Sequence, residues 1–403
     1  MPLLRLAELP LELLDCVAEN ADLGSSLSLC QTDRRTHGVC LRWIYRHLLL
    51  EDPVRAIGCL KTVISNAEAA HAVRILVIRV EKLSLLAAFY RLLTTALRLA
   101  TNLELLDIYT RPELFAAARG IHFSRLRRVS IPFCADIIPF LQLHQNLVEL
   151  SVDPVPNASV ATWRASLHPI LLPHLEVFSG PEIVAQSVLR GSRTTHIIVF
   201  WNPQLHQGFT DFFLAIDNCP KKFQNVHNIL TFWDPLLLGA IARYTPRLMS
   251  LGVRNVSSFH EPTEMDEFIS GVDAMLRTLP ELCSLSIVAN AVPASSTTAD
   301  LDREFEIVRR WGDVVPKLCR CVFPSTTEWF RGDTGVWCPL NMADKDARFQ
   351  WFLTTIISTP ALPAEYVQFL ETSGPDGRNM VAVLRATFAR DGTAGIARVL
   401  AAV

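Results

Sequence analysis

Short apolar runs recur through the middle of the chain with one spacing: an apolar residue, two variable positions, an apolar residue, one variable position and a third apolar residue. Copies of this pattern begin at Val73, Leu103, Leu126, Leu147, Leu248, Leu282 and Leu318, with weaker copies at Leu175, Thr195 and Val226. They begin 20 to 36 residues apart, and helical periodicity fills the intervals, as in residues 81–100 and 263–279. The pattern therefore predicts one strand and one helix per copy.

A strand-helix unit with L-x-x-L-x-L at its core resembles the leucine-rich repeat. The resemblance implies a solenoid in which each unit buries its apolar stripe against its neighbours, with strands on the concave face and helices on the convex face. An ordinary α/β domain is the alternative, because it also alternates strands and helices. We predict an α/β fold with three parts: a small helical module (1–50), a leucine-rich-repeat solenoid (51–340) and a helical C-terminal cap or tail (341–403).

The first 50 residues carry a pattern of short helices instead. Pro10 fits the first turn of a helix, because its missing N–H has no intrahelical partner there. Leu13, Leu14 and Val17 then lie on one helical face. Two further short helical segments follow, residues 27–40 and 41–50. Helices of this size bury little surface alone, so they must dock on the repeats, on a partner, or on both.

Three stretches of this segment together resemble the F-box: "LPLELL" (9–14), "LSLCQTDRR" (27–35) and "WIYRHL" (43–48). Asp33 departs from the family pattern, which more often has a small polar or basic residue there. The resemblance implies that the module binds the Skp adaptor through six residues: Leu9, Pro10, Leu14, Val17, Leu27 and Leu29. The alternative is a helix that caps the exposed first repeat.

Residues 308–340 resemble the end of the repeat array in fungal F-box proteins with degenerate leucine-rich repeats. The matching residues are Trp311, Pro316–Leu318, Phe323–Ser325, Trp329 and Trp337–Pro339. We interpret Trp311, Trp329, Trp337 and Trp351 as closing the hydrophobic core there, with a ligand pocket as the alternative. The family resemblance implies a substrate-recognition subunit of a Skp–cullin–F-box ubiquitin ligase. The alternative is a leucine-rich-repeat scaffold outside any ligase.

Side chains along a strand alternate between core and surface, so the repeat register predicts which residues face a substrate. In the clear copies the outward set is partly acidic, and in the weak copies it includes large aromatic residues, which are typical interface anchors. The predicted binding site for a protein substrate is Asp107, Tyr109, Glu149, Asp153, Trp201 and Phe232. If the copies near Thr195 and Val226 are out of register, Trp201 and Phe232 are core residues instead.

Composition narrows the classes of function. Half of the 403 residues are apolar, 19% are charged and the net charge is −2, which favours a large core and gives no field to attract nucleic acid or a membrane. Ten cysteines without a CxxC pair indicate free thiols in a reducing compartment. With no signal-peptide pattern at the N-terminus, we expect a cytoplasmic or nuclear protein.

Catalytic motifs are missing from the sequence. It contains no GxGxxG, GxxxxGK[ST] or GxSxG, and the closest approach to HExxH, residues 260–264, lacks the second histidine. Four arginines at positions 34, 35, 42 and 46 indicate a solvated helix face rather than a nucleic-acid contact. We therefore expect no enzyme activity, no cofactor and no metal. An unrecognised hydrolase is the alternative that a substrate screen would detect.

Overall fold

A computed structural model describes ten parts of the chain: residues 9–80, 87–108, 112–154, 169–202, 208–216, 223–257, 262–290, 298–331, 337–340 and five positions between 383 and 391. The chain divides into two compact units. Unit 1 comprises Met1–Phe200 and Asn218–Lys221, and unit 2 comprises Trp201–Asp217 and Lys222–Val403. Both contain strands and helices, which confirms the predicted α/β class. The predicted C-terminal tail lies almost wholly outside the described residues.

Unit 1 starts with three helices, α1 (Leu11–Asn20), α2 (Leu23–Cys30) and α3 (Arg34–Ile44), called the helical module below. Its strands are β1 (His47–Leu50), β2 (Ile75–Ile78), β3 (Leu105–Ile108), β4 (Arg128–Pro132), β5 (Glu149–Asp153), β6 (Val177–Pro181) and β7 (His196–Phe200). Between the strands lie α4 (Pro53–Ser65), α5 (Ala67–Ala72), α6 (Ala87–Leu99), α7 (Pro112–Phe115), the 3-10 helix η2 (Ala116–Ala118), α8 (Ile137–Leu143) and α10 (Glu182–Val188). Each strand pairs in parallel with the next one along the chain.

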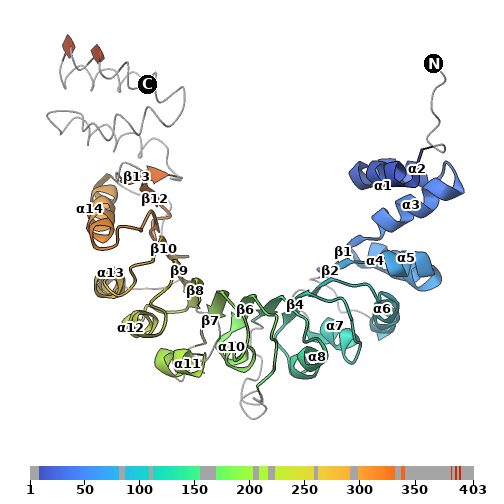
Figure 1. Cartoon of the computed structure of the whole chain (residues 1–403), viewed down its shortest axis with the longest axis horizontal. Helices are drawn as coiled ribbons and strands as arrows, with labels where there is room; N and C mark the ends of the chain where they lie inside the picture. Colours follow the sequence, from blue (N-terminus) through green and yellow to red (C-terminus); the bar gives the residue numbers. More distant parts are fainter. Residues whose placement is uncertain are drawn as a thin grey trace. The chain divides into compact units, whose positions relative to one another are not determined.

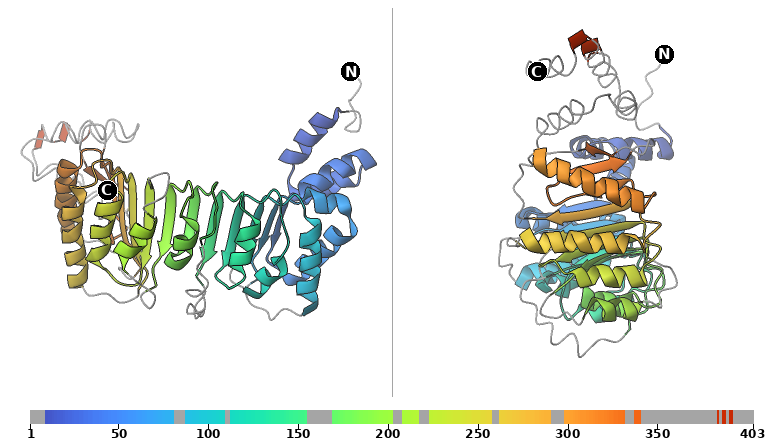
Figure 2. Two further views of the ribbon diagram at one scale, coloured as in Figure 1. Left: turned by 60° about the horizontal axis from the view of Figure 1, so that its bottom comes forward. Right: turned by 90° about the vertical axis from the view of Figure 1, so that its left-hand side faces the viewer.

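The helices between the strands of unit 1 lie along one face of the sheet (Figure 1). We call the opposite face of β1 to β7 the helix-free face, because none of the described helices covers it. The helical module extends past the edge formed by β1, with α1 and α2 farther from the strands than α3 (Figure 2). α3 packs against α5.

Unit 2 also alternates strands with helices, but its last strands are antiparallel. Its strands are β8 (Asn225–Leu230), β9 (Ser250–Asn255), β10 (Ser284–Ala289), β11 (Arg320–Val322), β12 (Glu328–Arg331) and β13 (Trp337–Leu340). Its helices are α11 (Phe209–Ile216), α12 (Pro235–Tyr244), α13 (Pro262–Leu276) and α14 (Thr298–Val314). β8 to β11 pair in parallel in chain order, whereas β12 and β13 turn back as antiparallel strands.

The core follows the repeat pattern in the clear copies. In the copy that begins at Leu103, the three apolar positions Leu103, Leu106 and Ile108 have no exposed surface. The strands pair with these positions in register, so Leu106 lies beside Leu76 on one side and Val129 on the other. Each unit therefore stacks its apolar residues in continuous rows between the strands and the helices, as the pattern predicts.

Two weak copies have a different register from the predicted one. The copy placed at Thr195 begins at Thr194, and the copy placed at Val226 begins at Phe223, since each of these residues is buried where a leucine would stand. The true start of the first copy was not recognised from the sequence because Thr194 is polar. In the structure its buried hydroxyl donates a hydrogen bond to the carbonyl of Leu175 at 3.1 Å. The register of the second copy was missed for the same reason, because the buried polar residue Asn228 stands at its third apolar position.

The predicted helical segment 41–50 is wrong in its second half. α3 ends at Ile44, and residues 47–50 form β1, which pairs with β2. Leu48 and Leu50 point into the core and Leu49 out of it, the alternation of a strand. The first strand of the sheet therefore falls inside the segment predicted as the helical module.

The late tryptophans close the core of unit 2, as predicted. Trp311, Trp329 and Trp337 are at most 3% exposed. The indole N–H of Trp329 donates to the carboxylate of Glu304 at 2.9 Å, which satisfies its one polar group. Trp351 lies outside the described residues.

Candidate functional site

Aspartate side chains cap the N-termini of the second and third helices of the module. Asp22 precedes α2 and accepts from the backbone N–H of Ser25 at 2.9 Å. Asp33 precedes α3 and accepts from the N–H groups of Arg35 and Thr36 at 2.8 and 2.9 Å, and from the Thr36 hydroxyl. These bonds from Thr36 hold the pKa of the Asp33 carboxyl below its usual value. Asp33, which departs from the F-box pattern, is thus a helix cap.

The interior of the helical module is a small apolar cluster. Leu14, Ala18, Val39 and Cys40 are at most 3% exposed, and five partly buried residues pack around them: Leu9, Leu29, Cys30, Trp43 and Ile44. At the edge of the cluster, the carboxylate of Asp15 accepts from the Trp43 indole at 3.0 Å and pairs with Arg42 at 3.2 Å. α1 is thereby fixed to α3 by apolar packing and by polar contacts.

The structure divides the six predicted adaptor-binding residues into three groups. Pro10, Val17 and Leu27 are exposed, Val17 by 39% and Leu27 by 49%. Leu9 and Leu29 are partly buried against the core. Leu14, at 2% exposed, cannot contact a partner, because its side chain fills the interior between α1 and α3. Its assignment to the adaptor-binding surface is wrong.

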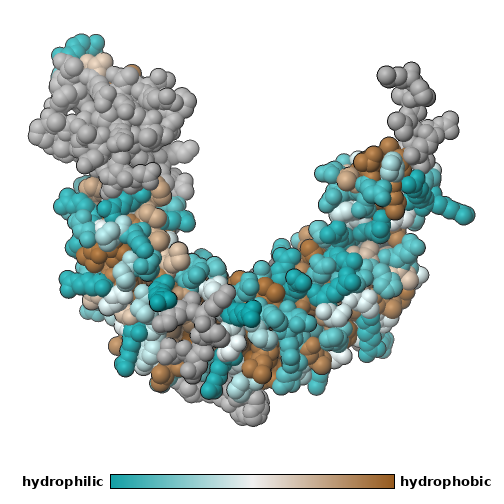
Figure 3. All heavy atoms as spheres, viewed as in Figure 1, coloured by the Kyte–Doolittle hydropathy of each residue, from teal (hydrophilic) through white to brown (hydrophobic). Residues whose placement is uncertain are grey.

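The predicted set omits two of the most exposed apolar residues. Leu13 is 51% exposed and lies one turn before Val17 on the same face of α1. Leu23, at the start of α2, is 64% exposed. The four-residue spacing from Leu13 to Val17 was a usable signal for Leu13. We call Leu13, Val17, Leu23 and Leu27 the apolar surface of the module, because all four are exposed apolar residues of α1 and α2. Figure 3 shows hydrophobic residues at the surface of this part of the molecule.

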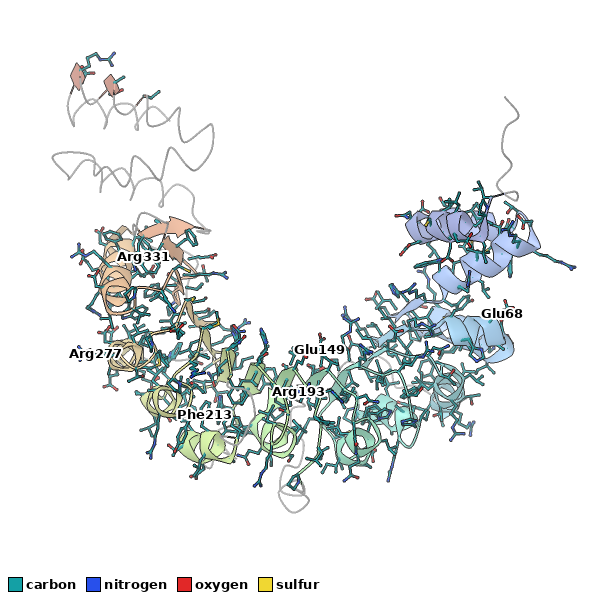
Figure 4. All side chains as sticks on the ribbon, in the orientation of Figure 1. Glu68, Glu149, Arg193, Phe213, Arg277 and Arg331 are labelled. Carbon is teal, nitrogen blue, oxygen red and sulfur yellow. The ribbon has the colours of Figure 1, made fainter. Side chains whose placement is uncertain are left out.

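The second candidate surface is the helix-free face of unit 1. Its middle row runs across neighbouring strands from Asp107 through the serines at positions 130, 151 and 179 to Ile198. A parallel row brings Arg128 beside Glu149, both exposed, and Figure 4 shows Glu149 on this face. The centre of the face, over β3 to β6, is therefore polar and carries short serine side chains.

Two carboxylates on this face are partly enclosed. Asp107 lies 3.8 Å from the guanidinium of Arg79, and its other oxygen, Oδ1, is buried without a hydrogen-bond partner among the described residues. Oδ2 of Asp153 is also buried without a hydrogen-bond partner among the described residues. Burial and the neighbouring charge of Asp107 raise the pKa of Asp153 above its usual value. Asp107, Glu149 and Asp153 thus share one face, as predicted, whereas Tyr109 lies outside the described residues.

Trp201 is a core residue, and its predicted role as an exposed anchor is wrong. It is 6% exposed and packs edge-to-face on Phe209 and Phe212 of α11, with ring centroids 4.7 and 4.9 Å away. Its indole N–H donates to the side-chain oxygen of Asn228 at 2.9 Å. Phe232, just after β8, is half-buried. The shifted register of the weak copies is the reason, as the alternative interpretation anticipated.

Comparison with known proteins gives no family. No protein-family model matches the chain, and none of the curated proteins matches it. In the described parts of the chain, no group of three or more His, Cys, Asp or Glu side chains is placed to hold a metal ion. Over the same residues, none of the helices combines the length and the apolar character that crossing a bilayer requires.

Proposed function

We propose that this protein is the substrate-recognition subunit of a Skp–cullin–F-box ubiquitin ligase. In this proposal the helical module is an F-box that binds the Skp adaptor, and the parallel strand-helix units are leucine-rich repeats that bind a protein substrate. The chain would do no chemistry itself. It would raise the concentration of a substrate lysine near the ubiquitin thioester held by other subunits.

The observation that carries the proposal is the apolar surface of the module. Leu13, Val17, Leu23 and Leu27 are 39 to 64% exposed on two short helices, next to a core that is already complete without them. Exposed leucines gathered in this way favour a protein partner. α1 and α2 also lie away from β1 (Figure 2), which is unlike a cap laid over the first strand.

The order of the strands supports the solenoid part of the proposal. Consecutive parallel pairing of β1 to β7 in unit 1, and of β8 to β11 in unit 2, is the arrangement of stacked repeats. A doubly wound sheet would reverse its strand order at one point. The helix-free face of unit 1, with its polar centre, is the surface on which we place the substrate.

The test is binding of the purified full chain to the Skp adaptor, measured by surface plasmon resonance. The double variant Val17→Asp/Leu27→Asp places two charges on the apolar surface and should weaken binding at least 100-fold. Val54→Asp/Leu236→Asp is the matched control, because Val54 of α4 and Leu236 of α12 are apolar residues outside the module that are 78% and 74% exposed. That variant should bind like the unchanged chain.

Two results would contradict the proposal. The first is absence of adaptor binding by a folded full chain, which would favour the scaffold alternative. The second is equal binding by the unchanged chain and by Val17→Asp/Leu27→Asp, which would place the contact elsewhere. Circular dichroism of each variant establishes that it is folded before binding is measured.

A further inference from the structure

A groove of 660 Å³ lies at the end of unit 1 where β4 to β7 begin. Three arginines line it, Arg125, Arg127 and Arg193 (labelled in Figure 4), together with the polar side chains of Ser124, Asn146 and His174. These residues belong neither to the helical module nor to the helix-free face. The groove is therefore a third surface, separate from the two described above.

The positive charges of the three groove arginines are not neutralised by ion pairs among the described residues. All three are exposed, and among the residues that the structure describes none of their guanidinium groups has an ion pair or a hydrogen bond. Two glutamates also line the groove, but the carboxylate of Glu104 is paired with Arg74 at 3.4 Å. The groove therefore carries an excess of positive charge in a chain whose net charge is −2.

The repeat register fixes the spacing of these groups. Arg125 immediately precedes the first apolar position of its copy, Leu126, and Arg193 has the same place before Thr194. Asn146 and His174 hold this position in the two copies between them. Neighbouring strands lie about 4.8 Å apart, so the two arginines are separated by three strand spacings, or roughly 14 Å. An extended peptide covers that distance in about four residues.

We propose that this groove binds an extended acidic segment of a partner protein, with carboxylates four residues apart on Arg125 and Arg193. Each planar guanidinium can hold a carboxylate through two parallel hydrogen bonds, a geometry that a lysine could not supply. Asn146 and His174, between the two arginines, are placed to donate to the backbone carbonyls of the segment. The proposal is independent of adaptor binding, because no residue of the helical module lines the groove.

Fluorescence anisotropy with the full chain tests this proposal. The probe is a labelled nine-residue peptide of glycine and serine with aspartates at its third and seventh positions. Peptides with asparagines there, or with the aspartates two residues apart, should bind at least fivefold more weakly. Arg125→Gln/Arg193→Gln should weaken binding of the probe at least tenfold. Arg91→Gln/Arg98→Gln, an equal charge change at two exposed positions of α6, should leave it within twofold.

Three outcomes would overturn the proposal. The first is no preference for the aspartate probe over the asparagine peptide. The second is equal affinity of Arg125→Gln/Arg193→Gln and the unchanged chain. The third is tighter binding of a single-stranded oligonucleotide with the same dependence on the two arginines, which would make the groove a nucleic-acid site. Since both arginines are exposed, the variants should fold, and their thermal unfolding curves verify this.

Discussion

At the scale of single residues, two polar residues and one glycine stand where the repeat pattern predicts large apolar residues, and their contacts in the structure explain each of them. Thr194 and Asn228 are buried with hydrogen-bond partners, which makes their burial tolerable. Gly180 stands at a third apolar position because a Cβ there would lie 3.0 Å from the ring of Phe178 and 3.1 Å from Val152. Sequence alone could not reveal these substitutions, since each depends on a neighbour in another part of the fold.

Asp153 gives the residue-scale prediction. Its pKa is raised in the folded chain, so its contribution to stability is fully present below the unfolded pKa and is lost as pH rises through the folded pKa. At neutral pH the enclosed carboxylate therefore destabilises unit 1. Asp153→Asn should raise the midpoint of thermal unfolding at pH 7 by roughly 2 °C, and the gain should vanish at a pH below about 3.

The control for Asp153 is on the same strand. Glu149→Gln also removes one negative charge from β5, but its side chain is exposed, so its midpoint at pH 7 should change less. A midpoint for Asp153→Asn that is unchanged or lower at pH 7 would show that the carboxylate has a stabilising partner. Scanning calorimetry at the two pH values measures all of these quantities.

At the scale of elements, α1 shows what periodicity can and cannot predict. The apolar residues Leu13, Leu14 and Val17 correctly predict an amphipathic helix, and Ala18 is a further apolar residue of it. They form two adjacent stripes, however: Leu14 with Ala18 and Leu13 with Val17. Which stripe is buried depends on the side chains that α3 presents, Val39 and Cys40. The F-box resemblance assigned Leu14 to the binding surface and left Leu13 out, and periodicity alone could not correct that assignment.

Leu14 and Leu13 are neighbouring leucines of α1, one buried and one exposed, so the same change to alanine should have different effects on stability. Leu14→Ala should destabilise the helical module by about 2–5 kcal/mol, because it opens a cavity in a small core. Leu13→Ala should change its stability by less than about 0.5 kcal/mol, yet weaken binding of the Skp adaptor. Hydrogen exchange of the α1 amides reports the first effect without depending on the rest of the chain. Equal protection in the two variants would mean that Leu14 is not the core residue of the pair.

At the scale of the whole molecule, the repeat pattern predicted that strands would follow one another in chain order, and within each unit they do. It missed β1, because "HLLL" lacks the repeat spacing and is apolar enough to continue a helix. What makes it a strand is its pairing with β2, almost 30 residues later, a contact that local sequence does not encode. The true end of the helical module is therefore Ile44 rather than residue 50.

This boundary predicts that two deletions only a few residues apart will behave differently. A chain without residues 1–45 keeps Arg46, whose carbonyl accepts from the N–H groups of Arg74 and Ile75, and keeps β1. A chain without residues 1–50 leaves β2 as an exposed edge and uncovers the core positions next to Leu48 and Leu50. We expect the first deletion to be monomeric and the second to aggregate through that edge. Light scattering after size-exclusion chromatography distinguishes them.

The same pair of deletions decides how loss of adaptor binding should be read. Loss of binding in the chain without residues 1–45, with its repeats still folded, assigns the contact to the helical module. Loss in the chain without residues 1–50 could come from a damaged sheet as well as from a missing partner surface. If both deletions are monomeric with equal thermal stability, β1 contributes nothing to the stability of the repeats. Residue 50 would then serve as well as Ile44 as the end of the segment that can be removed.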